Sequence, residues 1–229
     1  FLRYVTEKLN TKTLLVSETN LPEPENRSYF GNLNESNWIY NFSFPPLLVH
    51  GFLFEDGSKL YKWSKQLPMA NLGNSYLNFI ASHDGIGMRP AEGLLSDDEI
   101  SKMLERLKKN GSQFSMRKLS SNEDKVYEAN ISLFSALQFT DIDKEGDFVL
   151  ERFIASHCII LAIEGVPAFY FNSFFATKND DKSYLNSEVK RDLNRHKWDY
   201  SNLEAMLNDK NSVENKCYEL LKKLISIRK

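Results

Sequence analysis

The sequence predicts an α/β protein built on a parallel sheet. Four short apolar segments have the character of strands, helix-like segments separate them, and polar residues directly follow two of the strands. Strands that are joined through helices in this way normally pair in parallel, because each crossover returns the chain to the same edge of the sheet. Two architectures fit this order, a doubly wound sheet and part of a (β/α)8 TIM barrel.

The first half of the chain supplies two of these strands. Residues 2–10 have the pattern of the end of an amphipathic helix, and residues 13–16 are apolar and β-branched, which favours a strand. A second strand is expected over residues 38–42. Two prolines then open a helix that continues to about residue 53, because proline is tolerated in a first helical turn.

The second half continues the alternation. A third strand is expected over residues 76–81, and Ser96 with Glu99 forms a capping box that begins the next helix. The remaining predicted elements are a helix over residues 147–164, a fourth strand over 166–171 and a last helix over 213–228.

Composition limits the classes of function. The 229 residues are 41% apolar and 26% charged, which suits one large globular domain, and the net charge of -2 gives no reason to expect a nucleic acid or a membrane surface as partner. The longest apolar run, residues 158–163, is too short to span a bilayer. Cys158 and Cys217 suggest reduced thiols and therefore a cytoplasmic protein.

The polar residues after the strands distinguish the two architectures. Glu18 follows the first strand, and His83 and Asp84 follow the third. In a barrel, residues at the carboxyl ends of the strands form the active site. This placement favours the barrel.

Glu18 is a candidate general acid. Apolar residues beneath its carboxyl would partly desolvate it, which would raise its pKa and keep it protonated near neutral pH. The pattern alone fits a capping or salt-bridging glutamate at least as well.

His83 and Asp84 are candidate sugar ligands. An imidazole and a carboxylate could bind sugar hydroxyls and stabilise an oxocarbenium-like transition state. The alternative is an Asx-turn at Asp84 with His83 in the core. No group of residues has metal-ligand spacing and no phosphate loop is present, so neither a metal nor an organic cofactor is expected.

Five segments in order resemble the sucrose phosphorylase-like subfamily of the alpha-amylase family of glycoside hydrolases. These are residues 15–20, 38–46, 79–87, 162–170 and 192–196, which are similar to the family's strands five, six, seven and eight and to the loop beyond strand eight. The resemblance implies the C-terminal half of a (β/α)8 TIM barrel, with strands five to eight and their helices.

The resemblance also implies roles. Glu18 matches the acid/base, Asp84 the transition-state stabiliser and His83 a ligand of glucose hydroxyls. Tyr127 and Glu128 fall in a segment, residues 126–137, that resembles the family's mobile loop near the acceptor site. They are therefore expected to bind substrate, although a tyrosine buried in a loop is a simpler explanation for Tyr127.

Two arginines have implied roles as well. Arg195 matches an arginine that faces the donor glucose and phosphate, and a guanidinium suits a bidentate phosphate contact. Arg89 lies in a segment that resembles relatives acting on glucosylglycerate or sucrose 6'-phosphate, so it could pair with an anionic acceptor. The simpler explanations are a surface ion pair for Arg195 and an ion pair of Arg89 with Glu92 or Asp97.

The implied activity is that of a retaining glucoside phosphorylase, with inorganic phosphate as co-substrate and α-glucose 1-phosphate as product. Residues 1–229 would form a partial catalytic barrel domain without the N-terminal half, which carries the nucleophilic Asp, and without the C-terminal β domain. The chain alone is expected to be inactive, and a homo-oligomer could cover its open sheet edges. The alternatives are an α-glucosidase or transglucosidase, and a non-catalytic binding module.

Overall fold

A four-stranded parallel sheet organises the chain, as expected. The computed structural model describes residues 1–9, 12–118 and 124–228. The strands pair in the order β1-β2-β3-β7, and every pairing is parallel. This order follows the chain without a reversal, as in a barrel and unlike a doubly wound sheet. The strands are β1 (Val16–Ser17), β2 (Trp38–Tyr40), β3 (Ser75–Asn78) and β7 (Val166–Pro167).

The observed strands are shorter than the predicted ones. The expected fourth strand over 166–171 ends at Pro167, the Ala168 N–H still donates to the Asn78 carbonyl at 2.7 Å, and Phe171 begins a 3₁₀-helix. Among the described residues, β1 and β7 each pair on one side only, so they form the two edges of this sheet.

A second, antiparallel sheet was not predicted. It has the order β4-β6-β5 and consists of β4 (Ile86–Gly87), β5 (Gln113–Lys118) and β6 (Asp124–Asn130). The segment over 126–137, which resembles a mobile loop, is instead largely regular, because it forms the end of β6 and helix α6 (Leu133–Ala136). Its mobility stays a prediction. The strand buries Glu128 and Asn130. Burial of polar side chains breaks the apolar alternation by which a strand is recognised in a sequence.

The predicted helices are all present. They are α1 (Leu2–Leu9), α3 (Phe44–Leu53), α5 (Asp97–Lys109), α7 (Val149–Ala162) and α10 (Val213–Arg228). The capping box of α5 is confirmed, with Ser96 Oγ accepting from the Glu99 N–H at 3.3 Å and the Ser96 N–H donating to Glu99 Oε2 at 2.7 Å.

Further helices were not predicted. They are the α-helices α2 (Glu23–Arg27), α4 (Ser58–Gln66), α8 (Asp181–Ser187) and α9 (Tyr200–Asn208), and the 3₁₀-helices η1 (Ser28–Phe30), η2 (Arg89–Ala91), η3 (Phe171–Phe175) and η4 (Lys190–Asn194). The 3₁₀-helices have at most five residues, too few for a recognisable apolar period.

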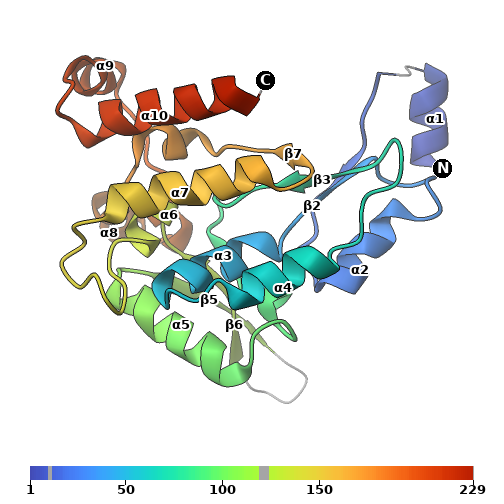
Figure 1. Ribbon diagram of the computed structural model, residues 1–229, viewed down its shortest axis with the longest axis horizontal. Helices are drawn as coiled ribbons and strands as arrows, with labels where there is room; N and C mark the ends of the chain where they lie inside the picture. Colours follow the sequence, from blue (N-terminus) through green and yellow to red (C-terminus); the bar gives the residue numbers. More distant parts are fainter. Residues whose placement is uncertain (10–11, 119–123, 229) are drawn as a thin grey trace.

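Helices pack against the strands to form the core. In Figure 1, α7 and α10 lie side by side, and α3 lies against α4. Helix α3 buries eight of its ten residues, including Phe44, Leu47 and Leu48. By contrast, α1 buries none of its residues and lies at the β1 edge of the sheet. The core therefore lies under the helices that follow β2 and β3.

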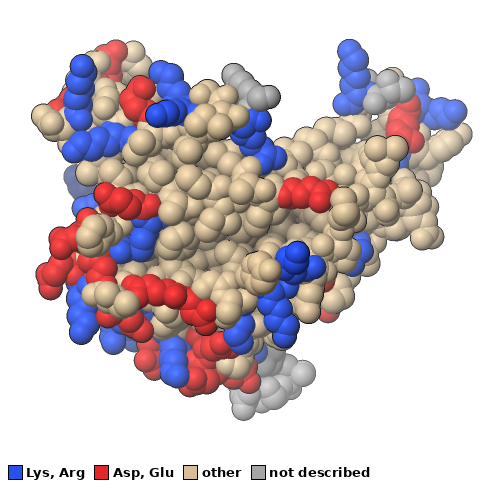
Figure 2. All heavy atoms as spheres, viewed as in Figure 1, with Lys and Arg blue, Asp and Glu red and all other residues tan. Residues whose placement is uncertain are grey.

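The surface has no single sign of charge on the face shown in Figure 2. Acidic and basic side chains alternate around its rim, and its middle is largely uncharged. None of the helices in the described part of the chain has both the length and the apolar character that crossing a bilayer requires.

Candidate active site

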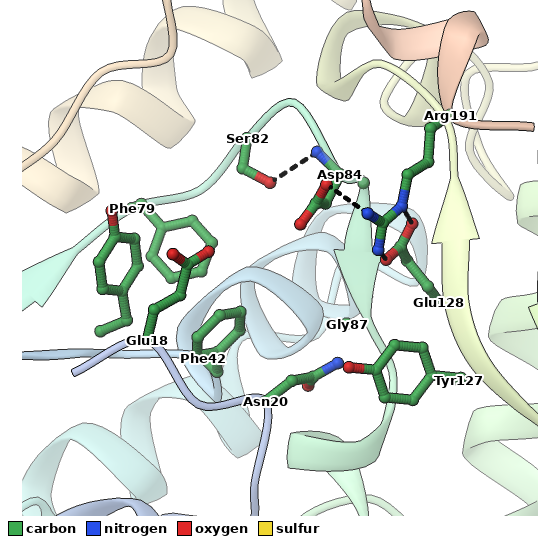
Figure 3. Close-up of a pocket in the computed structure, with 12 residues that line it drawn as sticks. Glu18, Asn20, Phe42, Phe79, Ser82, Asp84, Gly87, Tyr127, Glu128 and Arg191 are labelled. Atoms are coloured by element: carbon green, nitrogen blue, oxygen red, sulfur yellow. Dashed lines mark hydrogen bonds and ion pairs between the residues drawn. The ribbon is translucent and has the colours of Figure 1, made fainter. Parts of the chain in front are cut away.

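One cavity gathers residues from the ends of three strands. Its volume is about 150 Å³, and it lies beside the loops after β1, β2 and β3 and against strand β6. Figure 3 shows its side chains converging from these elements. Four predicted residues line it, namely Glu18, Asp84, Tyr127 and Glu128, together with Asn20, Tyr40, Phe42, Phe79, Ser82, Gly85, Gly87 and Arg191.

Two glycines allow the chain after β3 to run close to its neighbours. Gly85 has a φ of +113°, and a Cβ on it would lie 2.5 Å from the Ala129 carbonyl oxygen on β6. A Cβ on Gly87 would lie 2.7 Å from Asn20 Oδ1. Gly85 is required, because L side chains avoid its φ and the close atom belongs to the backbone, whereas at Gly87 a Cβ would displace the Asn20 side chain. The close approach brings Asp84 beside β6.

The side chain of Asp84 is held at one oxygen. Its Oδ1 lies 2.9 Å from Arg191 Nη1, 3.1 Å from Arg195 Nη2 and 3.3 Å from His83 Nε2. Its own backbone carbonyl accepts a 3.0 Å hydrogen bond from Asn130 Nδ2. No hydrogen bond or ion pair to Oδ2 is found within the described ranges, so this oxygen can accept from a ligand.

The turn at Asp84 differs from the simpler alternative. Its backbone N–H donates to Ser82 Oγ at 3.1 Å, so a serine side chain rather than an Asx-turn closes it. His83 is not a core residue, since its side chain is 59% exposed. Both observations leave the predicted sugar-binding role open.

Glu128 and Arg191 form the most enclosed ion pair of the cavity. The Glu128 side chain is 4% exposed, and Arg191 donates to it from Nε at 3.2 Å and from Nη2 at 2.8 Å. Asn130 Nδ2 donates to the same carboxylate. Burial raises the pKa of Glu128 above its usual value even though Arg191 opposes that change. Figure 3 shows Arg191 between Asp84 and Glu128.

Glu18 has a different environment. It is exposed, and no ion pair of Glu18 is found in the described part of the chain, so the salt-bridging alternative has no support. The partial desolvation expected from the sequence is not found either. Burial raises the pKa of the Tyr40 hydroxyl, and the nearby charge of Glu18 raises it further. Glu18 is thus a free carboxyl at the cavity wall.

Sequence reasoning missed Asn20 and Arg191. Asn20 Oδ1 is buried and has no hydrogen-bond partner among the described residues, and Figure 3 shows Asn20 and Tyr127 pointing toward one another. Its signal was its position two residues after Glu18, in the loop that follows β1. The signal for Arg191 was its spacing of four from Arg195, since both reach Asp84.

The remaining predicted residues lie outside the cavity lining. Arg195 borders it through Asp84 and also donates from Nε to the His83 carbonyl at 3.0 Å. Arg89 Nη2 lies 3.8 Å from Glu25 Oε2, and the alternative of an ion pair with Glu92 or Asp97 is not found among the described residues. The described residues contain no group of three or more His, Cys, Asp or Glu side chains that could hold a metal ion.

Fold and cavity together define a class of protein. Parallel strands in barrel order, with carboxylates at their carboxyl ends, form the C-terminal part of a (β/α)8 barrel of the alpha-amylase type. The chain is homologous to two groups of glucoside phosphorylases, the glucosylglycerate phosphorylases and the sucrose phosphorylases.

The relatives are similar along nearly the whole chain. A glucosylglycerate phosphorylase of Allomeiothermus silvanus is 36% identical over 99% of this chain and 41% of its own length. One from Escherichia coli is 31% identical over 100% of this chain and 41% of its own length. The sucrose phosphorylase of Bifidobacterium adolescentis is 26% identical over 74% of this chain and 33% of its own. The chain therefore spans less than half the length of these relatives.

A solved structure supports the fold. The sucrose 6F-phosphate phosphorylase from Thermoanaerobacter thermosaccharolyticum matches 100% of this chain and 43% of its own with a TM-score of 0.79 at 20% identity. No protein-family model matches the chain.

Proposed function

We propose that the protein is a retaining glucoside phosphorylase that transfers an α-glucosyl group to inorganic phosphate and releases α-glucose 1-phosphate. One observation carries the proposal. Glu18 and Asp84 line a single cavity in a chain that is 36% identical to a glucosylglycerate phosphorylase over 99% of its length. A carboxyl near the leaving group and a carboxylate near the sugar are the groups that retaining glucosyl transfer needs, together with a nucleophile.

The proposed reaction has two steps. In the first, Glu18 donates a proton to the leaving alcohol while the bond from C1 to that oxygen breaks and a carboxylate nucleophile bonds to C1. We assign this nucleophile to a part of the protein outside these 229 residues. In the second step a phosphate oxygen bonds to C1, the glucosyl ester breaks, and Glu18 accepts the proton of the phosphate.

The other side chains would bind the reactants. The unoccupied Oδ2 of Asp84 would face the positive charge that develops on the sugar, with His83 beside it as a hydroxyl ligand. Tyr127 and Arg195 would bind phosphate near C1, where excluding water favours phosphorolysis over hydrolysis. Arg89, whose pairing with Glu25 is as long as 3.8 Å, would be available to an anionic acceptor.

The first substrate to test is glucosylglycerate, because its leaving group is an anion and two of the relatives carry its name. The full-length polypeptide that contains this chain is incubated with glucosylglycerate, sucrose or sucrose 6'-phosphate, with and without phosphate. Glucose 1-phosphate that forms only with phosphate supports the proposal. Free glucose in both cases indicates a hydrolase, and binding without any product indicates a non-catalytic module.

The chain by itself is expected to release no glucose 1-phosphate, since it lacks the nucleophile in this proposal. Release by the isolated chain would contradict that assignment. We further propose that phosphate is the co-substrate and that no metal or organic cofactor takes part, so dialysis of the full-length protein against a chelator should leave its turnover unchanged. The cytoplasmic location and a homo-oligomeric state stay predictions.

A further inference from the structure

We propose that Glu128 is a positioning residue for Asp84, acting through Arg191, and not a ligand of the acceptor. The inference rests on the proposed function, because it assigns the part that one buried carboxylate plays in glucosyl transfer. The sequence had placed Glu128 among the substrate-binding residues.

The contacts of Glu128 leave it little capacity for a ligand. Its Oε1 accepts from Arg191 Nε at 3.2 Å and from Asn130 Nδ2, and its Oε2 accepts from Arg191 Nη2 at 2.8 Å. The side chain is 4% exposed. Both oxygens are therefore committed to protein donors, and a sugar or acceptor hydroxyl would have to displace a bidentate guanidinium to reach them.

Arg191 transmits this anchoring to Asp84. Two edges of its planar guanidinium are in use, one facing Glu128 and the other placing Nη1 at 2.9 Å from Asp84 Oδ1. The guanidinium of Arg191 is planar and rigid. Its two hydrogen bonds to Glu128 therefore also fix the position of Nη1, which pairs with Oδ1 of Asp84. Asp84 is held by Oδ1, and Figure 3 shows its other carboxylate oxygen pointing away from Arg191.

Asn130 closes the arrangement into a ring. Its side-chain amide donates to Glu128 and, at 3.0 Å, to the backbone carbonyl of Asp84. Glu128 therefore reaches Asp84 by two routes, one through Arg191 to the side chain and one through Asn130 to the main chain. Asn130 is itself fully buried.

Charge gives Glu128 a second effect on Asp84. Arg191 keeps its proton at all physiological pH values, and its charge is shared between the two carboxylates. With Glu128 neutral, Arg191 would pair with Asp84 alone and neutralise more of the negative potential at the donor site. A positively charged transition state would then be stabilised less by Asp84.

The decisive variant is Glu128→Gln in the full-length enzyme, because it removes the charge and keeps the shape. Both chemical steps pass through a transition state that faces Asp84, so we expect kcat to fall roughly 10- to 100-fold by the same factor for every leaving alcohol and for phosphate. The KM values of acceptor and phosphate should stay within about twofold. A loss confined to the KM of one acceptor would overturn the proposal and make Glu128 a ligand.

Two further variants control the result. Glu92→Gln removes ion pairs of 2.6 Å to Arg117 and 3.4 Å to Lys125, on the same hairpin but away from Asp84, and should keep wild-type kcat. Arg191→Lys should lose as much kcat as Glu128→Gln, and the double variant should lose no more than either. Additive losses would contradict action through Arg191.

Failure of the proposed function would be seen separately, as a wild-type enzyme that makes no glucose 1-phosphate. In that case a crystal structure of the Glu128→Gln chain tests the inference. Arg191 should leave residue 128 and pair with both oxygens of Asp84. Unchanged positions of Arg191 and Asp84 would overturn it.

Discussion

The two carboxylates of the cavity are held in opposite ways. Asp84 has three cationic or imidazole partners within 3.3 Å, and the ring through Glu128 and Asn130 fixes its loop. Glu18 is exposed and follows an edge strand in which Val16 is 42% exposed. The Asp84 side of the cavity, which we propose binds the donor sugar, is thus held in place by residues of this chain. On the other side, the carboxyl of Glu18, our proposed acid/base, is exposed.

The largest expected effect separates the roles of these two residues. In the full-length enzyme, Glu18→Gln should lower turnover on poor leaving groups by roughly 10²- to 10⁴-fold and affect activated leaving groups much less, since only the former need a proton. Asp84→Asn should lower turnover by one factor for all leaving groups. Steady-state rates on aryl glucosides of graded leaving-group pKa measure this.

A surface glutamate serves as the control for that series. Glu151 is exposed on α7, and Glu151→Gln should keep wild-type rates on every substrate. Equal leaving-group dependence for Glu18→Gln and Asp84→Asn would remove the distinction between the two sides.

Backbone packing beside Asp84 should give the next largest effect. Gly85→Ala places a Cβ 2.5 Å from the Ala129 carbonyl at a φ of +113°, so we expect a loss of about 3 kcal/mol in the free energy of unfolding. Gly73→Ala is the matched control, because its φ is +89° but nothing lies within 4 Å of the new Cβ. It should lose only about 1 kcal/mol. Urea unfolding of the chain compares them, and equal losses would show that the close approach to β6 is unimportant.

On the open side, Asn20 should affect the alcohol and not the donor. Its Oδ1 is buried without a partner, which suits a hydroxyl group of the leaving alcohol. Asn20→Ala should raise the KM of the acceptor alcohol about tenfold in the synthetic direction and leave the KM of glucose 1-phosphate unchanged. Asn202→Ala, on α9 and away from the cavity, is the control. An equal change in both KM values would place Asn20 on the donor side.

The smallest effect concerns pH. Burial raises the pKa of Glu128 above its usual 4.5, so the folded chain takes up a proton before the unfolded chain does as the pH falls. The stability of the wild type relative to Glu128→Gln should therefore rise as the pH falls toward 4.5. This result would show that burying the ionised Glu128 carboxylate lowers the stability of the chain near neutral pH.

Asp143 provides the opposite sign. Hydrogen bonds from the Phe148 N–H and from Arg152 help to lower its pKa to about 2, so its contribution is fully present above the usual 3.8 and is lost as the pH falls toward 2. Urea unfolding between pH 7 and pH 3 should show this loss relative to Asp143→Asn. If both variants shifted in the same direction, the enclosure of Glu128 would not be the cause.

The sequence was sufficient for the parallel sheet and for the order of its strands. Two prolines located the start of α3, apolar periodicity located α10, and the capping box located the start of α5. Family resemblance then selected Glu18 and Asp84, which do line one cavity. These features depend on local pattern, and local pattern is what a single sequence displays.

The antiparallel sheet could not be predicted, and neither could the contacts that join Glu128 through Arg191 to Asp84. Strand β6 buries Glu128 and Asn130 rather than alternating apolar residues, so its pattern resembles a polar loop. Arg191 precedes the recognised motif, and its partners are remote in sequence. The expected surroundings of Glu18 also failed, because burial at a strand end depends on what packs over it.

The ring around Asp84 has a consequence for folding order. It joins residues that are 46, 63 and 107 positions apart in the chain. Long loops close late, because their entropy is lost before the contact is gained, whereas the helices form from neighbours in sequence. The Asp84 side of the cavity should therefore be among the last regions to form. Protection from hydrogen exchange of the Met88 amide, which donates to the Tyr127 carbonyl at 2.9 Å, would report that the segment after β3 has joined β6.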